Sequence, residues 1–404
     1  TLIHTFLIQI LHGNVACTAL PHLTGKSFSA TAYTNARSRL PLALFWDLLE
    51  RVVDCLFPVR QTTGLWRGHR TWLLDGSSFS MPDQPELQEH FGQPGSQKKG
   101  CGFPVAHILA LFHAGTGFLQ RVIAAPMRTH DLAQAASMHP EMSEGDVLVA
   151  DRGFASYAHL ALLLLRKMHA VFRCHQRQIV DFRPRRQHTS QRKARAGLPR
   201  SRWLKRLGRH DQLVEYPRPT HKPVWMSDAE FAALPETLTI RELRFTISQP
   251  GQRTRLITLV TTLLDPELYP AQALAELYEQ RWQIETNLRH LKTTMKMEVL
   301  HCQTVEGVLK ELAMFALAYN LVRLVMLQAA RRQDVPLERI SFIDALRWLR
   351  TATPGTPLPN LVVNPHRPNR VEPRVLKRRM KEYCRMTKPR AELHKALLRK
   401  KHAA

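Results

Sequence analysis

The sequence predicts an α/β fold, and two observations support this prediction. From about residue 66, short hydrophobic runs typical of strands alternate with helical patterns. A pair of long strand-like runs is then followed by two long helical patterns, at residues 270–297 and 304–331. This order is typical of an α/β core with a β-rich insertion before its last helices.

The elements follow one another along the chain. Residues 1–65 are expected to be helical, because Leu44, Leu48 and Val52 follow Pro41 with helical spacing. The runs at 105–112 and 118–124 flank a Gly-containing turn and predict a hairpin. The remaining expected strands are 71–74, 146–150, 170–173, 237–247 and 253–263, and a helix is expected at 157–166.

These patterns divide the chain into five expected regions. They are a helical N-terminal region at 1–65, the first part of the core at 66–174, a basic, β-rich insertion at 175–265, core helices at 266–332, and a basic C-terminal region at 333–404.

The charge of the chain points to a nucleic-acid partner. The 404 residues include 58 Lys and Arg against 33 Asp and Glu, which gives a net charge of +25. Residues 177–209 hold twelve basic residues against one acid, and residues 366–404 hold fourteen against three. We therefore expect both segments to contact DNA phosphates. The hydrophobic content of 44% excludes a wholly disordered chain.

Cysteine spacing and hydropathy indicate a cytoplasmic protein. The six cysteines form no C-x-x-C pair, which disfavours a zinc ribbon, a redox dithiol and a disulfide scaffold. The longest purely apolar run, residues 312–319, is far shorter than the ~20 residues of a membrane-spanning helix. No membrane segment is expected.

Two acids are candidate catalytic residues because of where they stand. Asp75 and Asp151 each follow a buried-looking strand and precede a turn signal. Carboxylates at the ends of central strands are held rigidly at the edge where α/β sheets place their sites. An Asp-Gly pair after a strand is also a common turn, so either acid alone is a weak indication.

A third acid lies on the helix expected at 270–297. Tyr278, Arg281, Glu285 and Lys292 fall within an arc of about 60° at roughly 100° per residue. A solvated face with ion pairs one turn apart would have the same pattern. Three carboxylates from separate elements would suit two Mg²⁺ ions that assist phosphodiester cleavage, with nearby cations holding the phosphates.

The motifs resemble those of bacterial insertion-sequence transposases. Residues 75–83 (DGSSFSMPD) and 146–154 (DVLVADRGF) resemble the first and second aspartate motifs of these enzymes. The spacing Tyr278-x2-Arg281-x3-Glu285-x6-Lys292 matches the Y-R-E-K signature of the insertion-sequence-four type. The resemblance continues at 318–323 (AYNLVR) and, more weakly, at 388–390.

The resemblance implies a fold, an activity and a set of site residues. The fold would be ribonuclease-H-like, with a β-rich insertion before the helix that carries the glutamate. The family cuts DNA at the inverted repeats of a mobile element and joins the ends to target DNA, with Mg²⁺ or Mn²⁺ and usually as a homodimer. Asp75, Asp151 and Glu285 would be catalytic and metal-binding, and Tyr278, Arg281 and Lys292 would bind DNA, in some members with a hairpin intermediate and a flipped base. Residues 1–65, where DNA binding is expected, are short for the family. The resemblance also implies that the protein is bacterial and associated with the nucleoid.

Other readings of the sequence stay open. Trp225 and Trp282 could stack on an extruded base, although tryptophan more often packs in a core. An inactive or domesticated transposase would bind DNA without cutting it. A tyrosine-type recombinase would use Arg289, His290 and a nucleophilic Tyr383 without metal.

Overall fold

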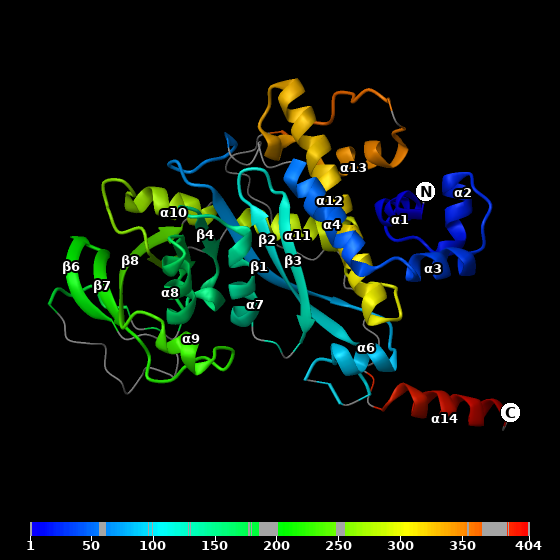
Figure 1. The fold of residues 1–404 in the computed structure, drawn as a ribbon, viewed down its shortest axis with the longest axis horizontal. Coiled ribbons are helices and arrows are strands. Elements are labelled where there is room, and N and C mark those ends of the chain that lie inside the picture. Colours follow the sequence, from blue (N-terminus) through cyan, green and yellow to red (C-terminus); the bar gives the residue numbers. More distant parts are fainter. Residues whose placement is uncertain are drawn as a thin grey trace.

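Nine strands in the described part of the chain form one mixed sheet. The computed structural model describes residues 2–55, 62–95, 97–98, 100–127, 129, 131–176, 178, 180–185, 201–247, 255–353, 355–365, 386 and 388–402. The strand order across the sheet is β3-β2-β1-β4-β5-β9-β8-β7-β6 (Figure 1). The bounds are β1 Thr71–Ser80, β2 Val105–His113, β3 Leu119–Pro126, β4 Val147–Ala150, β5 His169–Arg173, β6 Arg202–Gly208, β7 Asp211–Pro217, β8 Thr237–Ile247 and β9 Arg255–Thr261.

The first five strands have a characteristic arrangement. Strands β1, β2 and β3 are antiparallel neighbours, whereas β4 is parallel to β1 and β5 is parallel to β4. Between β5 and helix α10 (Ala271–Glu279) the chain forms β6 to β9 and the short helix α9 (Asp228–Ala232). These strands extend the same sheet, because β9 pairs antiparallel with β5. The residues between β8 and β9, 248–254, lie outside the described residues.

Alternation along the strands produces two hydrophobic cores, one on each face of the sheet. Leu73, Val149 and Val171 belong to the first core, whereas their neighbours Leu74 and Ala150 belong to the second. The first core is covered by α1 (Leu2–Leu11), α4 (Leu42–Cys55), α10, α11 (Trp282–Arg289), α12 (Val305–Gln333) and α13 (Phe342–Thr351). The second is covered by α7 (Asp131–Ser137), α8 (Tyr157–Leu165) and α9.

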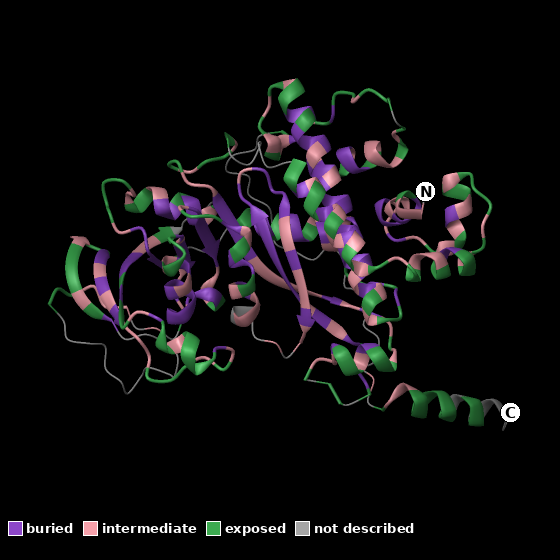
Figure 2. Ribbon diagram, in the orientation of Figure 1, coloured by how far each residue is buried: buried purple, intermediate pink, exposed green. Residues whose placement is uncertain are grey.

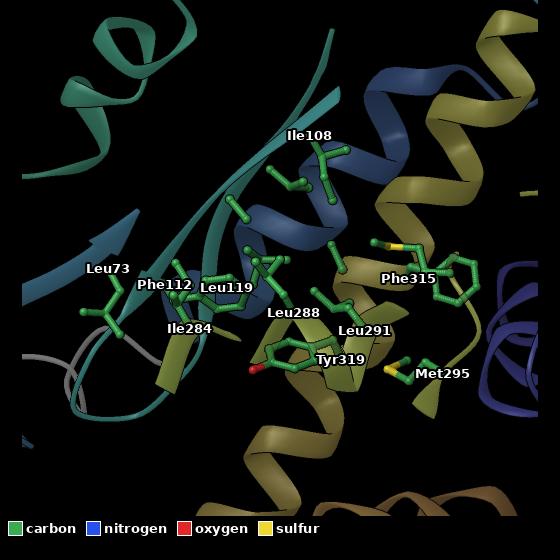
Figure 3. Packing of buried hydrophobic residues seen from close by; sticks show 14 of the residues in the cluster. Leu73, Ile108, Phe112, Leu119, Ile284, Leu288, Leu291, Met295, Phe315 and Tyr319 are labelled. Carbon is green, nitrogen blue, oxygen red and sulfur yellow. The ribbon is translucent and has the colours of Figure 1, made fainter. Parts of the chain in front are cut away.

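The first core fixes the helix that carries Glu285. Ile284, Leu288 and Leu291 are buried against side chains of the sheet and of α12, such as Phe112 and Tyr319 (Figure 3). Buried apolar side chains each stabilise a fold by about 1.5–3 kcal/mol. Glu285 lies next to this buried stripe, and its position is therefore set by the packing of its neighbours.

Helix α12 is the central helix of the molecule. It is the one helix in the described residues that is long and apolar enough to cross a membrane, and 83% of its most apolar stretch is buried in the structure. Figure 2 shows this helix as largely buried where it crosses the sheet beside α4. Its burial on all sides accounts for its apolar composition.

The Ala318–Arg323 motif has a structural role in α12. The Tyr319 hydroxyl donates to the Gly117 carbonyl at 2.8 Å, and the Asn320 side chain exchanges two 2.9 Å hydrogen bonds with the backbone of Leu119. Arg323 donates to the Thr116 carbonyl. Gly117 has a φ of +67°, and a side chain there would collide with the Arg323 guanidinium. The motif thus ties α12 to the β2–β3 turn.

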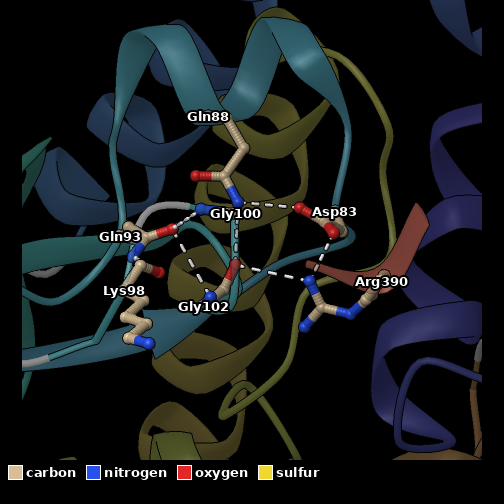
Figure 4. A network of polar contacts seen from close by, with 7 residues as sticks. All are labelled: Asp83, Gln88, Gln93, Lys98, Gly100, Gly102 and Arg390. Carbon is tan, nitrogen blue, oxygen red and sulfur yellow. Dashed lines mark hydrogen bonds and ion pairs between the residues drawn. The ribbon is translucent and has the colours of Figure 1, made fainter. Parts of the chain in front are cut away.

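The C-terminal helix α14 (Arg390–His402) is anchored at its first residue. The Arg390 guanidinium pairs with Asp83, which also accepts a hydrogen bond from Gln88 at 2.7 Å (Figure 4). The same guanidinium lies 3.8 Å from the centroid of the Phe103 ring. Beyond this anchor α14 projects away from the body of the molecule (Figure 1). The other helices are α2 (Leu20–Thr24), α3 (Ala30–Ser38) and α6 (Pro85–His90).

Two local expectations from the sequence are wrong. Asp75 and Gly76 do not end a strand, because β1 continues to Ser80 and remains paired with β2. The expected single helix at 270–297 is three segments: α10, α11 and a π-helix at His290–Thr294. The π-helix is marked by an i→i+5 bond from the Met295 amide to the His290 carbonyl.

Candidate active site

Asp75 and Asp151 lie side by side because of strand register. Leu74 and Ala150 are the last parallel partners of β1 and β4, so the two aspartates follow directly where these strands stop pairing. Side chains alternate between faces, and Leu73 and Val149 face the first core. Asp151 has extended backbone angles and continues this alternation. Both carboxylates are therefore directed to the face that α10 and α11 cover.

The carboxylate of Asp75 is buried among like charges. Burial, the largest cause, and the nearby carboxylates of Asp151 and Glu285 together raise its pKa to about 6, against the opposing effect of Arg281 and the Gly76 amide. The Gly76 amide donates to Asp75 Oδ1 at 2.9 Å. A raised pKa of this origin is typical of carboxylates assembled for a function.

The junction of α10 and α11 brings the third acid to this pair. The Tyr278 hydroxyl, near the end of α10, donates to Asp151 Oδ1 at 3.2 Å. Arg281 stands at the N-cap of α11, and its guanidinium donates to Glu285 Oε1 at 3.0 Å and to Asp75 Oδ2 at 3.4 Å. Tyr278, Arg281 and Glu285, three of the four residues predicted to share one helix edge, are thus neighbours across the break between the helices.

Arg281 is the shared cation of the three acids. Its side chain is only 12% exposed and lies under the neighbouring rings, 5.8 Å from the centroid of Tyr278 and 6.0 Å from that of Trp282. Burial alone would lower its pKa, but Tyr278, Asp75 and the other two acids outweigh burial and raise it. Within the described residues its Nε–H has no hydrogen-bond partner, so this arrangement leaves one buried donor unused.

The turn that follows Asp151 is fixed by a pair of buried histidines. His159 Nδ1 lies 2.9 Å from the Phe154 carbonyl, and its Nε2 lies 2.8 Å from His139 Nε2. A carbonyl only accepts, so His159 carries its proton on Nδ1, and His139 donates from Nε2. Burial lowers the pKa of His159 to about 4 and that of His139 to about 2, and both rings are therefore neutral near pH 7.

Comparison with known proteins agrees with this geometry. A family model described as "Transposase DDE domain" matches residues 66–321, which span β1 to the middle of α12 and include all three acids. The chain belongs to the DDE transposase family.

Two curated relatives come from Escherichia coli (strain K12). "Putative transposase InsZ" is 29% identical over 127 residues, which are 31% of this chain and 42% of that protein. "Transposase InsG for insertion sequence element IS4" is 25% identical over 337 residues, which are 79% of this chain and 70% of that protein. The chain thus spans less than half of the length of InsZ. The insertion-sequence-four resemblance is confirmed by the match to InsG.

One solved structure also aligns with the chain. It is the cryo-EM structure of a piggyBac transposase synaptic complex with hairpin DNA, with a TM-score of 0.44 and 10% sequence identity. The alignment covers 86% of this chain and 69% of that one.

The other predicted DNA-binding residues are not all near the three acids. Trp282 borders Arg281 and is 44% exposed. Lys292 lies in the π-helix, whose wider turn departs from the helical register that placed it beside Glu285. Trp225 packs against the second core, on the opposite face of the sheet from the acids. The structure thus brings Trp282 to the site but not Trp225.

Other residues at this site were missed in the sequence. Arg173, at the end of β5, has its guanidinium 4.0 Å from Asp151 Oδ1, and the expected strand at 170–173 gave a signal for that place. The His139–His159 pair had no signal in the sequence, because the two residues are brought together only by the packing of α8.

The residues of the recombinase alternative lie elsewhere. The ring of His290 stacks on that of Phe342, with 4.0 Å between the ring centroids, and Tyr383 lies outside the described residues.

DDE transposases use divalent metal ions, and the donor set here fits such an ion. Asp75, Asp151 and Glu285 supply the carboxylate oxygens that Mg²⁺ and Mn²⁺ prefer. In the described residues, however, no three acidic, His or Cys side chains are close enough to share one ion. Arg281 instead lies between Asp75 and Glu285. The acids are therefore suited to bind a cation. In this structure the cation that Asp75 and Glu285 contact is the guanidinium of Arg281.

Proposed function

We propose that this chain cuts DNA at the ends of an insertion sequence and joins those ends to target DNA. The observation that carries the proposal is the convergence of Asp75, Asp151 and Glu285 on one buried guanidinium, within a matched transposase domain. We also propose that the core is ribonuclease-H-like, because the order β3-β2-β1-β4-β5 combines an antiparallel meander with two parallel strands.

The three acids would hold Mg²⁺ or Mn²⁺, with two ions as the proposed number. When bound, the metal supplies Lewis acidity for attack by water or a 3′-hydroxyl on phosphorus and for departure of the leaving oxygen. Strand β1, which stays paired with β2 beyond Asp75, and the end of β4 hold Asp75 and Asp151 in place. Packing of Ile284 and Leu288 holds Glu285 in place. Such preorganised groups lower the barrier without reorganisation during the reaction.

Arg281 would have two successive partners. In the structure its guanidinium neutralises Asp75 and Glu285. A guanidinium freed from those carboxylates could donate two parallel hydrogen bonds to a DNA phosphate. Its Nε–H, which is buried and has no partner among the described residues, would gain an acceptor once the side chain moved to the phosphate. We propose the same phosphate-binding role for Lys292, and a hydrogen bond from Tyr278 to another phosphate.

The partner of the proposed reaction is double-stranded DNA. The terminal inverted repeats of the element and the target DNA would be bound in turn, and we propose that a homodimer holds the two ends together. The net charge of +25 supports a DNA partner, because it favours association with a polyanion.

The experiment uses the DNA that flanks the gene. Duplexes with the flanking inverted repeats are incubated with the full chain and increasing Mg²⁺ or Mn²⁺, and cleavage and strand transfer are measured on denaturing gels. The proposal requires metal-dependent cuts at the repeat boundary. Binding without any cut at saturating metal would instead identify a DNA-binding protein without transposase activity.

A further inference from the structure

A pair of buried histidines lies in the second core, behind the strands that lead to the acids. His159, on α8, and His139, at the start of a short 3₁₀-helix, are at most 1% exposed. Their Nε2 atoms are 2.8 Å apart and their rings are nearly coplanar, with an interplanar angle of 5°. A buried imidazole costs free energy unless its nitrogens are paired, and here the pairing extends to the turn after Asp151.

His159 closes the turn that follows Asp151. The Phe154 amide donates to the Asp151 carbonyl at 3.1 Å, and the Phe154 carbonyl accepts from His159 Nδ1 at 2.9 Å. The backbone amide of His159 is fixed as well, because it donates at 3.2 Å to the side chain of Ser156, the N-cap of α8. The backbone of Asp151 is therefore linked to the imidazole through a single residue, Phe154.

The same imidazole supports the cation beside Asp151. The rings of His159 and Phe172 stack with 5.3 Å between their centroids and an interplanar angle of 22°. Phe172 on β5 belongs to the second core, so the next side chain, that of Arg173, is directed to the face of the acids. Its guanidinium lies 4.0 Å from Asp151 Oδ1. His159 thus contacts both the turn of Asp151 and the strand residue next to Arg173.

His139 determines which nitrogen of His159 carries the proton. Because the Phe154 carbonyl only accepts, His159 is protonated on Nδ1, and its Nε2 accepts from His139 Nε2. Without the donor of His139, the Nε2 atom of His159 would be buried with no partner. A proton on Nε2 would remove that penalty, but it would turn the lone pair of Nδ1 toward the Phe154 carbonyl, and two acceptors repel each other.

We propose that His159 is a positioning residue for metal binding and that His139 acts through it by fixing its tautomer. The inference rests on the proposed function, because Asp151 is proposed there as a metal ligand. The two histidines lie on the opposite face of the sheet from the acids, and they act by holding the backbone of Asp151 and the strand that places Arg173. Replacing side chains that orient a metal ligand typically weakens metal binding about 10–100-fold.

The first test compares two variants of His159 in the full chain. In His159→Asn the amide nitrogen takes the place of Nδ1 and retains the donor to Phe154, whereas in His159→Gln it takes the place of Nε2 and that donor is lost. We expect near-wild-type Mn²⁺ affinity for His159→Asn and roughly 10-fold weaker binding for His159→Gln, measured by the electron paramagnetic resonance of free Mn²⁺. A packing role predicts the reverse order, because Gln is closer in size to His. Equal affinities or the reverse order would overturn the proposal.

The second test concerns His139. His139→Gln retains a donor at the place of Nε2, whereas His139→Leu removes it at a similar side-chain volume. We expect Mn²⁺ affinity close to wild type for His139→Gln and roughly 10-fold weaker binding for His139→Leu. The same affinity in these two variants would refute the role of His139.

The tautomer of His159 can be measured directly in the metal-free chain. Nitrogen-15 spectra of histidine-labelled protein distinguish a protonated from an unprotonated ring nitrogen, and the signal of His159 is assigned by its loss in His159→Asn. We expect the proton on Nδ1 in the wild type and a shift toward Nε2 in His139→Leu. A wild-type proton on Nε2 would overturn the proposal, and this result decides the matter even where His139→Leu does not fold.

Leu163→Ala is the matched control for stability. Leu163 lies one turn after His159 on α8 and is fully buried in the second core, so its truncation leaves a cavity there without removing a contact to the turn of Asp151. At a temperature where circular dichroism shows every variant to be folded, Leu163→Ala should bind Mn²⁺ like the wild type. Equal weakening in Leu163→Ala and His159→Gln would mean that lowered stability alone accounts for the loss, against the proposal.

The outcomes separate this inference from the proposed function. A wild-type chain that binds Mn²⁺ and cuts the flanking repeat, with unchanged affinity in all four histidine variants, would refute the positioning role and leave the function intact. A wild-type chain that binds Mn²⁺ without cutting DNA would refute the proposed activity but not the positioning role. A wild-type chain that binds no Mn²⁺ would refute both.

Discussion

Arg281 donates to carboxylates on two separate elements, and this explains why one side chain influences the whole candidate site. It neutralises Asp75 and Glu285 without a metal and is close to Tyr278 and Trp282. Strong non-additivity is expected among groups that share one charge. Removing one charge of this site is therefore expected to change how the remaining charges are neutralised.

Replacing Arg281 should separate metal binding from catalysis. In Arg281→Gln the acids lose their internal cation, so Mn²⁺ should bind more tightly, as measured by the electron paramagnetic resonance of free Mn²⁺. Cleavage should fall roughly 100-fold, because a phosphate contact is lost and the reacting groups are misplaced. Arg289→Gln, which removes a charge from the same helix, serves as the control. Equal Mn²⁺ affinity in wild type and Arg281→Gln would show that the guanidinium does not compete with metal.

Replacing Asp75 should stabilise the metal-free protein. The folded-state pKa of Asp75 is about 6 against an ordinary 3.8, so the folded chain holds this proton more strongly and loses stability as the pH rises from about 4 to 6. At pH 8 Asp75→Asn removes that cost, roughly 2–3 kcal/mol, since each pKa unit is worth about 1.4 kcal/mol. Tm should rise at pH 8 and be unchanged near pH 3.5. A lower Tm at pH 8 would mean that the pair with Arg281 outweighs burial.

At the scale of elements, the sequence predicted the positions of strands better than the geometry between them. Short, nearly continuous apolar runs located β2, β3, β4 and β5, because a strand with one face in each core needs apolar residues throughout. The Asp75-Gly76 pair suggested a turn, but β2 continues to pair with β1 beyond it. Local turn propensity was outweighed by this long-range pairing, which a local pattern does not contain.

The helix at 270–297 illustrates the same limit. Its apolar stripe predicted which side is buried, and Ile284, Leu288 and Leu291 are buried as expected. The break before α11 and the π-helix at His290–Thr294 had no sequence signal. Tyr278, Arg281 and Glu285 could therefore be grouped from spacing, whereas the position of Lys292 could not.

Asn320 should be among the most sensitive residues of α12. Its side chain is fully buried and makes two hydrogen bonds to the backbone of Leu119. Asn320→Leu would leave the Leu119 amide and carbonyl unpaired, at a cost of about 2–4 kcal/mol in the free energy of unfolding. Urea denaturation measures this loss. Asn35→Leu, at an exposed position of α3, should change stability by less than about 0.5 kcal/mol. Similar stability of Asn320→Leu and wild type would show that these hydrogen bonds are dispensable.

At the scale of the whole molecule, the strongly basic segments are separate in sequence from the three acids of the candidate site. Two segments of the sequence, 177–209 and 366–404, carry most of the net charge of +25. The described part of the first segment includes Arg183, Arg206 and Arg209, all of which are exposed. The second includes α14, which Arg390 anchors beside Phe103. Composition predicted a polyanionic partner, whereas the grouping of the three acids depends on strand register and on the junction of α10 and α11.

Removal of residues 366–404 should weaken binding to duplex DNA of any sequence. The deletion removes fourteen basic and three acidic residues, and counterion release makes such contacts steeply dependent on salt. The plot of log K against log salt, measured by fluorescence anisotropy, should become flatter. A chain whose tail retains its length but has Lys395 and Arg399 replaced by Gln should show a smaller change in the same direction. An unchanged slope after the deletion would identify the tail as a solvated arm.

The most direct test of the account is the cleavage rate of three single variants in titrated Mg²⁺ and Mn²⁺. Asp75→Asn, Asp151→Asn and Glu285→Gln each remove one carboxylate charge, and Glu276→Gln removes one from an exposed position of α10. We expect the three site variants to bind the flanking repeat without cutting it, and Glu276→Gln to cut it at the wild-type rate. Double variants of the site acids should cut no more slowly than the single variants. A site variant that cuts within about 10-fold of the wild-type rate would contradict the assignment of that residue, and normal cutting by all three would contradict the account itself.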